Sequence, residues 1–323
     1  MESAIMPRCK FAAWLARPSS CVAIVGASGW IGMALTDHVL AVCPDLPPDR
    51  LRLFGSSRRP LQLRDQRPLI EPLDALSGLG NGEWLILHAA IVGGDRVDGG
   101  DLQEMRRRND ALLGRVLALA DMADTRRLVT VSSGAVGRPD MGPPDRVAYT
   151  AMKREHEAVV ADWARRTGKS VLVPRVFNLG GPFINHTEAY ALGAFILALA
   201  RRGRITIGAA DPVFRSFVHV SEMARVILDM AVDEAQSAEP FDVGGAEVVE
   251  LGALARAVGQ ALGRSDPPIE RQEPGDGPGD WYVGDGRRYQ GALFRRGEHP
   301  TPLARTVADT VAYLAATGAL DET

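Results

Sequence analysis

Tyr149 and Lys153 are the residues of this chain whose types and spacing most directly suggest chemistry. The chain has 34 arginines but only 3 lysines, so a lysine four residues after a tyrosine is unusual in this composition. On a helix, residues four apart lie on the same face, which would bring the phenol and the ammonium together. A nearby ammonium lowers the pKa of a phenol from its ordinary value of about 10. Such a tyrosine can pass a proton to or from an alcohol or ketone oxygen.

The alternative for this pair is a solvated helix surface. Five tyrosines and three lysines in 323 residues give only about 0.05 accidental pairs with this spacing. Arginine would supply charge, but its planar, permanently protonated head does not replace a compact ammonium as a ribose donor and proton relay. The spacing therefore favours a catalytic pair.

Two serines follow an apolar segment upstream of this pair. In the stretch "LVTVSSGAVG", Ser132 and Ser133 stand where a buried strand is expected to end. Ligands gather at the carboxyl ends of strands in open α/β sheets, and a hydroxyl there can hydrogen-bond a reacting oxygen. Serine at a strand end is also common as a turn or cap. The presence of Tyr149 and Lys153 favours the catalytic interpretation.

A glycine-rich loop follows the first apolar segment. "CVAIVGASGWIGMAL" places Gly26, Gly29 and Gly32 between an expected strand and an expected helix. In a dinucleotide site, the first glycine makes the tight turn, the second admits a pyrophosphate and the third allows close helix–strand packing. The helix N-terminus adds free N–H groups and a positive dipole end. A plain tight turn is the alternative, but this context favours a dinucleotide.

The end of the second expected strand indicates which dinucleotide binds. An acidic residue there would bind the adenosine ribose, whereas basic residues would accept a 2′-phosphate. The sequence reads "LRLFGSSRRP", with no Asp or Glu and with Ser57, Arg58 and Arg59 after the strand. Arginine forks suit a phosphate, although two exposed loop arginines are the alternative. NADP(H) is favoured over NAD(H).

The elements that must position these residues form a regular alternation. Short apolar segments predict buried parallel strands at 21–26, 51–55, 84–90, 127–133 and 170–176, with amphipathic helices between them. This order predicts an α/β fold, a doubly wound parallel sheet. We expect an N-terminal extension or short packing helix (1–19), a cofactor domain (20–176, with 216–245 returning to it), and a smaller C-terminal substrate-binding lid (177–215 and 246–323).

The composition excludes several other classes. An apolar content of 46%, a charged content of 24% and a net charge of −3 are those of an ordinary globular protein without a general attraction to nucleic acid. No apolar run approaches membrane-spanning length, and the N-terminus lacks the apolar core of a secretion signal. Three cysteines without metal-ligand spacing predict a reducing compartment. We therefore expect a cytoplasmic protein, and no metal site.

The motifs as a set resemble the extended short-chain dehydrogenase/reductases, the NAD(P)-dependent nucleotide-sugar epimerase/dehydratase family. The resemblance joins the glycine loop, His88-Ala89-Ala90, Ser132-Ser133 and Tyr149-x-x-x-Lys153. It continues in "PRVFNLGGP" (174–182), "FRSFVHVSEMA" (214–224) and "FDVGG" (241–245), and covers roughly residues 20–315. It implies a Rossmann-type cofactor domain and a homodimer formed by the helix that carries Tyr149 and the long helix before it.

The resemblance also implies a role for each matching position. Tyr149 would be the acid/base, Lys153 would hold the nicotinamide ribose, and Ser133 would bind the reacting oxygen. The substrate-binding residues would be Ser132, Asn178 and Arg215. The expected cofactor-binding residues are Gly26, Ser28, Gly29, Trp30, Ile31, Gly32, Ser57, Arg58, Arg59, Ala89, Ala90, Asn109, Lys153 and Val176.

Departures from the family pattern narrow the reaction. Family 4,6-dehydratases carry an Asp-Glu pair directly after the catalytic Ser/Thr, where this chain has Gly134 and Ala135. Water elimination would lack its acid and base, so a dehydratase is not expected. The family's Val-Tyr-Gly is replaced by Val136-Gly137-Arg138, which removes a tyrosine near the sugar.

The sequence therefore predicts an enzyme that acts on a nucleotide sugar. Our first expectation is an NADP(H)-dependent reductase of a nucleotide-linked keto sugar, since NADP(H)-type residues suit a net redox reaction. The alternative is a nucleotide-sugar epimerase with tightly bound NAD(P). A reductase of non-sugar carbonyls, or a non-catalytic NADP(H)-binding protein, is less favoured.

Overall fold

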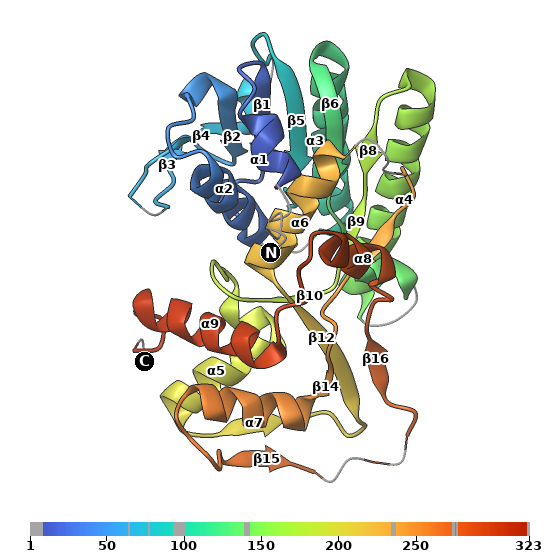
Figure 1. Ribbon diagram of the computed structural model, residues 1–323. Helices are drawn as coiled ribbons and strands as arrows, with labels where there is room; N and C mark the ends of the chain where they lie inside the picture. Colours follow the sequence, from blue (N-terminus) through green and yellow to red (C-terminus); the bar gives the residue numbers. More distant parts are fainter. Residues whose placement is uncertain are drawn as a thin grey trace, which may run out of the picture. The chain divides into compact units, whose positions relative to one another are not determined.

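The computed structural model describes residues 9–63, 65–76, 78–92, 101–138, 143–233, 237–272, 275 and 277–321. The chain divides into two compact units (Figure 1): unit 1 comprises residues 1–175 and 224–241, and unit 2 comprises residues 176–223 and 242–323. The segment that returns to unit 1 is thus shorter than the expected 216–245. Residues 1–8 of the expected extension lie outside the described residues.

Unit 1 alternates strands and helices along its length. Its elements are α1 (Lys10–Leu15), β1 (Ser20–Val25), α2 (Trp30–Val42), β2 (Leu51–Gly55), β3 (Arg59–Pro60), β4 (Leu69–Pro72), β5 (Glu83–His88), α3 (Leu102–Met122), β6 (Asp124–Thr130), β7 (Ser132–Ser133), α4 (Pro144–Thr167), β8 (Val171–Leu172), and most of β9 (Pro174–Val176) and of α6 (Val220–Val232). Short 3-10 turns lie at Pro48–Arg50, Leu73–Ala75 and Gly134–Gly137.

The central sheet of unit 1 confirms the expected α/β architecture. Seven strands follow the order β3-β4-β2-β1-β5-β6-β8. All neighbours are parallel except the β3–β4 edge pair. From β1 the chain first adds β2 on one side of this strand and later adds β5 on its other side. This is the doubly wound arrangement. Consequently the carboxyl ends of β1, β2 and β5 meet at one edge of the sheet.

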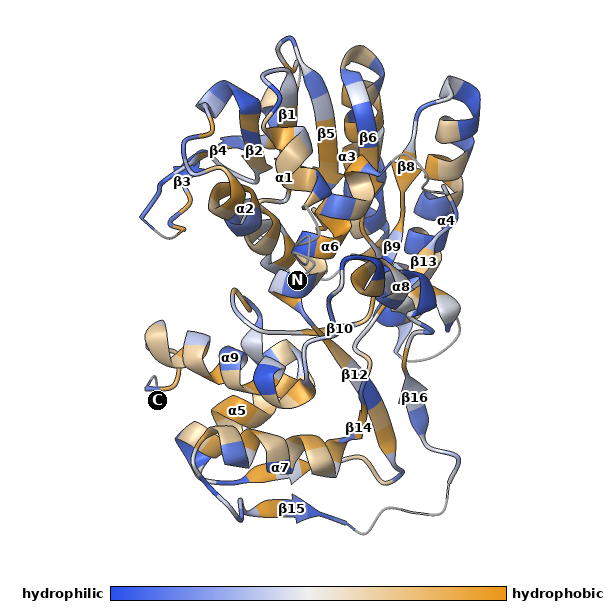
Figure 2. Ribbon diagram, viewed as in Figure 1, coloured by the Kyte–Doolittle hydropathy of each residue, from blue (hydrophilic) through white to orange (hydrophobic). Residues whose placement is uncertain are grey.

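Both faces of this sheet are buried, which explains its uninterrupted apolar strands. Alternate residues of β1, such as Ala23 and Val25, pack in one cluster with Ile86 of β5, Val116 of α3 and Val160 of α4. The intervening positions of β1 are also fully buried. Figure 2 accordingly shows β5 and β8 largely in hydrophobic colours.

Two expected strands are each divided in the structure. The segment 127–133 forms β6 and β7, and the segment 170–176 forms β8 and β9; β7 and β9 join β13 (Phe241–Val243) in a separate three-stranded sheet. Pro174, which has no N–H to donate, begins β9 and marks the second break. At the first break, the backbone of Val131 lies between strands, and its carbonyl accepts a hydrogen bond from Lys153 at 3.0 Å.

The N-terminal segment packs onto unit 1 as the helix α1. Phe11 and Leu15 of this helix are fully buried. The backbone N–H of Phe11 donates to the Asp229 carboxylate of α6 at 2.9 Å. The Arg50 guanidinium donates to the carbonyl of Leu15, at the C-terminal end of α1, at 2.5 Å. The expected packing helix is therefore present within 9–19.

Unit 2 contains short strands covered by helices. Its elements are β10 (Asn178–Gly180), α5 (Ala191–Arg202), β11 (Ile205–Ile207), β12 (Val213–His219), β14 (Val248–Glu250), α7 (Leu251–Ala261), β15 (Ile269–Arg271), β16 (Asp280–Tyr282), α8 (Arg287–Arg295) and α9 (Leu303–Ala316). Strand β12 pairs with β10, β14 and β16, while β11 pairs with β15. Among the described residues, none of the helices combines the length and apolarity needed to cross a bilayer.

The turn from β1 to α2 is packed too tightly for larger residues. A Cβ atom at Gly32 would lie 2.0 Å from the carbonyl oxygen of Gly26 and 2.8 Å from the Cα of Ala27. Since both obstacles are backbone, they cannot rotate away. Helix α2 therefore approaches β1 this closely only because position 32 has no side chain.

We expect Gly32→Ala to lower the free energy of unfolding by about 1–3 kcal/mol, because the added methyl must displace backbone. The matched control is Gly114→Ala in α3, where an added Cβ meets no atom within 4 Å. In that exposed helical position the alanine should stabilise by about 1 kcal/mol. Urea unfolding measures both changes. Equal effects at the two positions would contradict the packing argument.

Candidate functional site

The glycine loop lies between the ends of three parallel strands. The Gly26 N–H donates to the Phe54 carbonyl of β2 at 2.9 Å, and the Ala89 N–H donates to the Val25 carbonyl of β1 at the same distance. Gly26 has φ +93°, and a Cβ there would lie 2.5 Å from the backbone nitrogen of Ala90. These contacts bring the predicted residues of the loop and of the Ala89-Ala90 segment together.

The N-terminus of α2 has the properties of a pyrophosphate site. Gly29 is the N-cap and supplies no side-chain hydrogen bond to the first helical N–H groups. These groups and the positive end of the helix dipole are therefore available to an anion. Trp30 is buried, while Ser28 and Ile31 are half-buried. The loop thus fits a dinucleotide.

Asn109 ties α3 to the loop that follows β5. Its side-chain oxygen accepts from the Val92 N–H at 2.9 Å, and its amide nitrogen donates to the carbonyls of Val92 and Met105 at 2.9 and 2.8 Å. The side chain is buried, and these three hydrogen bonds all join it to backbone atoms. Asn109 therefore supports the cofactor side of the site by fixing the segment after Ala90.

The residues after β2 lie in the exposed segment 56–60. The side chains of Ser57, Arg58 and Arg59 form no hydrogen bond or ion pair with another described residue. Glu71 lies opposite Phe54 in the neighbouring strand β4, but its carboxylate binds Arg52 through two hydrogen bonds of 2.5 and 2.9 Å. The segment thus offers cationic groups and no unengaged carboxylate from these two strands.

Helix α4 carries the predicted catalytic pair. The helix begins with Pro144, whose missing N–H is tolerated at a first helical position. Tyr149 is half-buried and Lys153 is buried one turn later. The Lys153 ammonium lies 6.0 Å from the centroid of the Tyr149 ring and donates to the Val131 carbonyl. The expected shared face is thus present.

The two serines face different partners. The Ser132 hydroxyl is buried and donates to the Glu157 carboxylate at 2.6 Å. The Ser133 oxygen accepts from the Ala135 N–H at 3.2 Å and caps the 3-10 turn that follows. Because β7 contacts α4 directly, both serines lie against the helix that carries Tyr149. Ser133, which is half-buried, keeps its hydroxyl proton available for another acceptor.

Burial sets the electrostatics around Lys153. Desolvation lowers the pKa of Lys153 from 10.5 to about 8, while the negative charge of Glu157 acts in the opposite direction. Desolvation, followed by the charges of Lys153 and His156, lowers the pKa of His88 to about 3. His88 is therefore neutral at physiological pH and adds no second positive charge beside the ammonium.

Unit 2 contains the predicted substrate-binding residues Asn178 and Arg215. The Asn178 amide donates to the Ser216 carbonyl at 3.1 Å. The Arg215 guanidinium binds the Asp280 carboxylate at 2.6 Å and the Asp280 carbonyl at 2.9 Å, and lies 5.8 Å from the Tyr282 ring centroid. An anionic substrate would therefore have to share Arg215 with Asp280. Val176, in β9, is buried.

Three residues of these networks were missed from the sequence: Glu157, Arg175 and Asp280. Glu157 stands four residues after Lys153 and eight after Tyr149, a spacing that places all three on one helix face and was available as a signal. The partners Arg175 and Asp280 come from distant strands. Nothing in their local sequence reports these contacts.

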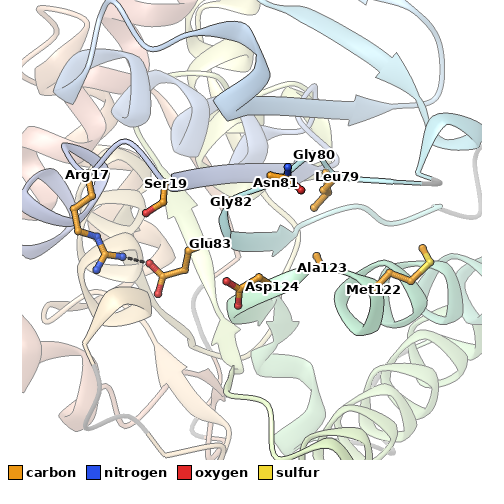
Figure 3. A pocket seen from close by; sticks show the side chains of 10 residues that line it. All are labelled: Arg17, Ser19, Leu79, Gly80, Asn81, Gly82, Glu83, Met122, Ala123 and Asp124. Atoms are coloured by element: carbon orange, nitrogen blue, oxygen red, sulfur yellow. Dashed lines mark ion pairs between the residues drawn. The ribbon is translucent and has the colours of Figure 1, made fainter.

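A separate hollow of about 660 Å³ lies at the opposite edge of the unit 1 sheet (Figure 3). Its lining includes Ser19, Glu83 and Asp124, which stand at the amino ends of β1, β5 and β6. Figure 3 shows the ion pair between Arg17 and Glu83 in its wall. Because ligands of open α/β sheets bind at the carboxyl ends of the strands, this hollow is not the predicted site.

We expect the Lys153 ammonium to titrate near pH 8 in the folded protein. With three lysines in the chain, ¹⁵N NMR of the side-chain amines resolves it, and the variant Lys153→Arg assigns its signal. The unfolded chain binds more protons between about pH 8 and pH 10.5, so this group makes stability rise with pH across that window. Lys153→Met should remove that rise in urea unfolding and Lys169→Met should keep it. If the Lys153 ammonium stays protonated above pH 10, the result contradicts the expected burial.

Comparisons with known proteins agree with this geometry. The family model described as the NAD dependent epimerase/dehydratase family matches residues 22–244. UDP-glucuronic acid decarboxylase 5 of Arabidopsis thaliana is 27% identical over 167 residues, which are 48% of this chain and 48% of that protein. dTDP-L-rhamnose 4-epimerase of Burkholderia thailandensis is 26% identical over 129 residues, 39% of this chain and 36% of that protein. The aligned part thus spans about half the length of these curated relatives, or less.

Solved structures share the fold at low sequence identity. The UDP-glucose 4-epimerase of Thermotoga maritima superposes with a TM-score of 0.69 at 16% identity, covering 92% of this chain and 99% of that chain. The enzyme WbmF of Bordetella bronchiseptica, in complex with NAD+, gives a TM-score of 0.74 at 14% identity, covering 94% and 95%. Since the family model spans more than half of the sequence, this chain belongs to the NAD-dependent epimerase/dehydratase family.

Proposed function

We propose that this chain is a nucleotide-sugar epimerase that retains a nicotinamide cofactor and uses Ser133, Tyr149 and Lys153. The observation that carries the proposal is the Tyr149–Lys153 pair on one face of α4, beside the strand that bears Ser133. Membership in the family supports a nucleotide-sugar substrate. Gly134 and Ala135, in place of a carboxylate pair, favour a reaction without water elimination.

The residues of unit 1 would divide the chemistry among them. Tyr149 takes the proton of a sugar hydroxyl and returns it, while the Ser133 hydroxyl donates to the same sugar oxygen. The Lys153 ammonium stabilises the phenolate of Tyr149 and binds the cofactor ribose. The glycine loop and the N-terminus of α2 hold the pyrophosphate. When bound, the oxidised nicotinamide would accept a hydride from the sugar carbon and later return it.

Unit 2 would bind the substrate through Asn178 and Arg215. The Arg215 guanidinium already binds Asp280, and an arginine fork can hold a diphosphate bidentately. A substrate diphosphate would therefore compete with the Asp280 carboxylate for one edge of this guanidinium. In this proposal, the side chains of unit 2 determine which sugar and which nucleotide are bound.

A second candidate is an NADP(H)-dependent reductase of a nucleotide-linked keto sugar, which was our first expectation from the sequence. It is favoured by one observation, the exposed cationic segment Ser57–Arg58–Arg59 after β2. The relatives support the epimerase more than the reductase, because they include a named epimerase and structures of epimerases. The two readings differ in whether the cofactor leaves after each turnover.

Replacing the acid/base tests the catalytic assignment. We expect Tyr149→Phe to lower kcat by about 10²–10⁴, because the proton of the sugar hydroxyl loses its acceptor, while cofactor binding stays unchanged. The control is Tyr313→Phe, whose ring packs on Phe183 in unit 2. Turnover is followed by NMR on a panel of UDP- and dTDP-hexoses. Full activity of Tyr149→Phe would exclude the assignment.

Cofactor identity and retention are tested together. We expect the double variant Arg58→Ala, Arg59→Ala to weaken NADPH relative to NADH by about 10–100-fold, the loss of hydrogen bonds to one phosphate. Arg67→Ala is the matched control, since Arg67 is exposed and binds Gln62. Calorimetry measures affinity, and denaturation followed by chromatography shows whether nucleotide was retained. An exchangeable cofactor in the purified protein would favour the reductase; an unchanged preference would exclude the phosphate-binding role.

The family resemblance further supports a homodimer through α3 and α4. Val159 on α4 is an exposed large apolar residue in this region. We expect sedimentation to give about twice the mass of 34.7 kDa, and a charge at position 159, as in Val159→Glu, to shift it to the monomer. A wild-type monomer at micromolar concentration would contradict this.

A cytoplasmic location stays a prediction.

A further inference from the structure

Glu157 is a buried carboxylate with an unusual set of partners. Its oxygens accept from the Ser132 hydroxyl at 2.6 Å and from two nitrogens of Arg175 at 2.8 and 2.6 Å. Only 8% of its side chain is exposed, against 28% for Arg175. Burying a carboxylate costs hydration, and only an opposite charge together with further hydrogen bonds offsets that cost. Glu157 thus joins three elements of unit 1: α4, β7 and β9.

This carboxylate lies in line with the catalytic pair. Tyr149, Lys153 and Glu157 follow one another at intervals of four residues on α4, and therefore share a helix face. The Ser132 hydroxyl that binds Glu157 belongs to the two-residue strand β7, whose other member is Ser133. Holding Ser132 therefore fixes the backbone on which the Ser133 hydroxyl depends.

The charge of Glu157 also reaches the ammonium. Lys153 is buried and donates to one carbonyl, that of Val131. Within the part of the chain that the structure describes, the other titratable groups around it are Tyr149 and His156 of α4 and His88 of β5. His156 is occupied by the Asp110 carboxylate at 2.7 Å, and His88 is buried on β5. Among the described carboxylates, Glu157 is therefore the one whose charge favours the charged form of Lys153.

We infer that Glu157 is a positioning residue of the site: its carboxylate holds the Ser132–Ser133 strand against α4 and keeps a negative charge beside the Lys153 ammonium. The kinetic part of this inference rests on the proposed function, whereas the electrostatic part does not. A purely structural Glu157–Arg175 bridge is the competing explanation. It would stabilise the fold without changing the charge state of Lys153.

Two variants separate the contact from the charge. Glu157→Gln keeps the size and can still accept from Ser132, but removes the charge. We expect it to lower the Lys153 pKa by about one unit in ¹⁵N NMR of the lysine amines. Ser132→Ala removes the hydroxyl and keeps the charge. It should leave the Lys153 pKa within about 0.3 units and lower kcat by about tenfold, with less change in KM.

The matched control is Glu71→Gln, which removes the carboxylate from the Arg52–Glu71 ion pair of β2 and β4 in the same unit. It should lower stability without moving the Lys153 titration. If Glu157→Gln does not fold, Glu157→Asp keeps the charge and shortens the reach, so the Lys153 pKa should be kept and kcat should fall.

A Glu157→Gln protein whose Lys153 titrates as in the wild type would overturn the inference, as would a Ser132→Ala protein with wild-type kcat. If the wild type turns over none of the nucleotide sugars, the proposed function fails, and the NMR comparison still decides the electrostatic part. Failure of the inference alone would appear as normal turnover with an unmoved Lys153 pKa in Glu157→Gln.

Discussion

The burial of one ammonium group, that of Lys153, constrains the architecture around the candidate site. A lysine in such a place loses most of its hydration, and desolvation lowers its pKa to about 8. It stays charged at neutral pH only because the protein supplies compensating groups. The Lys153 ammonium donates a hydrogen bond to the Val131 carbonyl at 3.0 Å, and Glu157 supplies a negative charge one turn along the helix. The compensation in turn requires Arg175, which prevents the carboxylate from standing unpaired.

The same requirement explains an irregularity in the sheet. A continuous strand over 127–133 would use the Val131 carbonyl in a ladder; instead β6 ends at Thr130 and β7 begins at Ser132. The carbonyl between them is engaged by Lys153, and the two serines enter a different sheet with β9. The strand is thus interrupted at the carboxyl end of the main sheet, directly before the two serines. At the carboxyl end of β1, a Cβ added at Gly26 or Gly32 would collide with backbone atoms, so the loop presents bare backbone at these positions.

Much of this arrangement follows from the sequence. The apolar segments predicted the parallel sheet, the glycine spacing predicted the tight turn after β1, and the interval of four residues predicted the shared face of Tyr149 and Lys153. These features are local, because periodicity and turn chemistry are properties of neighbouring residues. Strand breaks were not predicted. The run 170–176 contains Pro174 and Arg175 among its apolar residues, but the separate pairing of its two halves depends on distant strands.

Long-range partners account for the remaining differences. Three features depend on contacts between segments that are separated along the chain. They are the contact of Ser132 with Glu157, the binding of Arg215 to Asp280, and the membership of β12 in unit 2. Short strands such as β3 and β16 contain too few residues for a period to be visible. The spacing of Glu157 from Lys153 was visible, but a glutamate at helical spacing is most often a solvated surface residue. Its importance becomes clear only with Arg175 beside it.

The measurement that tests the account most directly is the near-ultraviolet absorbance of the nicotinamide when the cofactor-loaded protein meets a panel of UDP- and dTDP-hexoses. If Tyr149 and Lys153 assist hydride transfer from the sugar to the nicotinamide, at least one sugar should produce absorbance of the reduced nicotinamide in the wild type. No sugar should produce it in Tyr149→Phe. Absorbance that stays unchanged with every sugar, although the cofactor is bound, would contradict the central claim. Equal absorbance in the wild type and in Tyr149→Phe would contradict the role of the tyrosine.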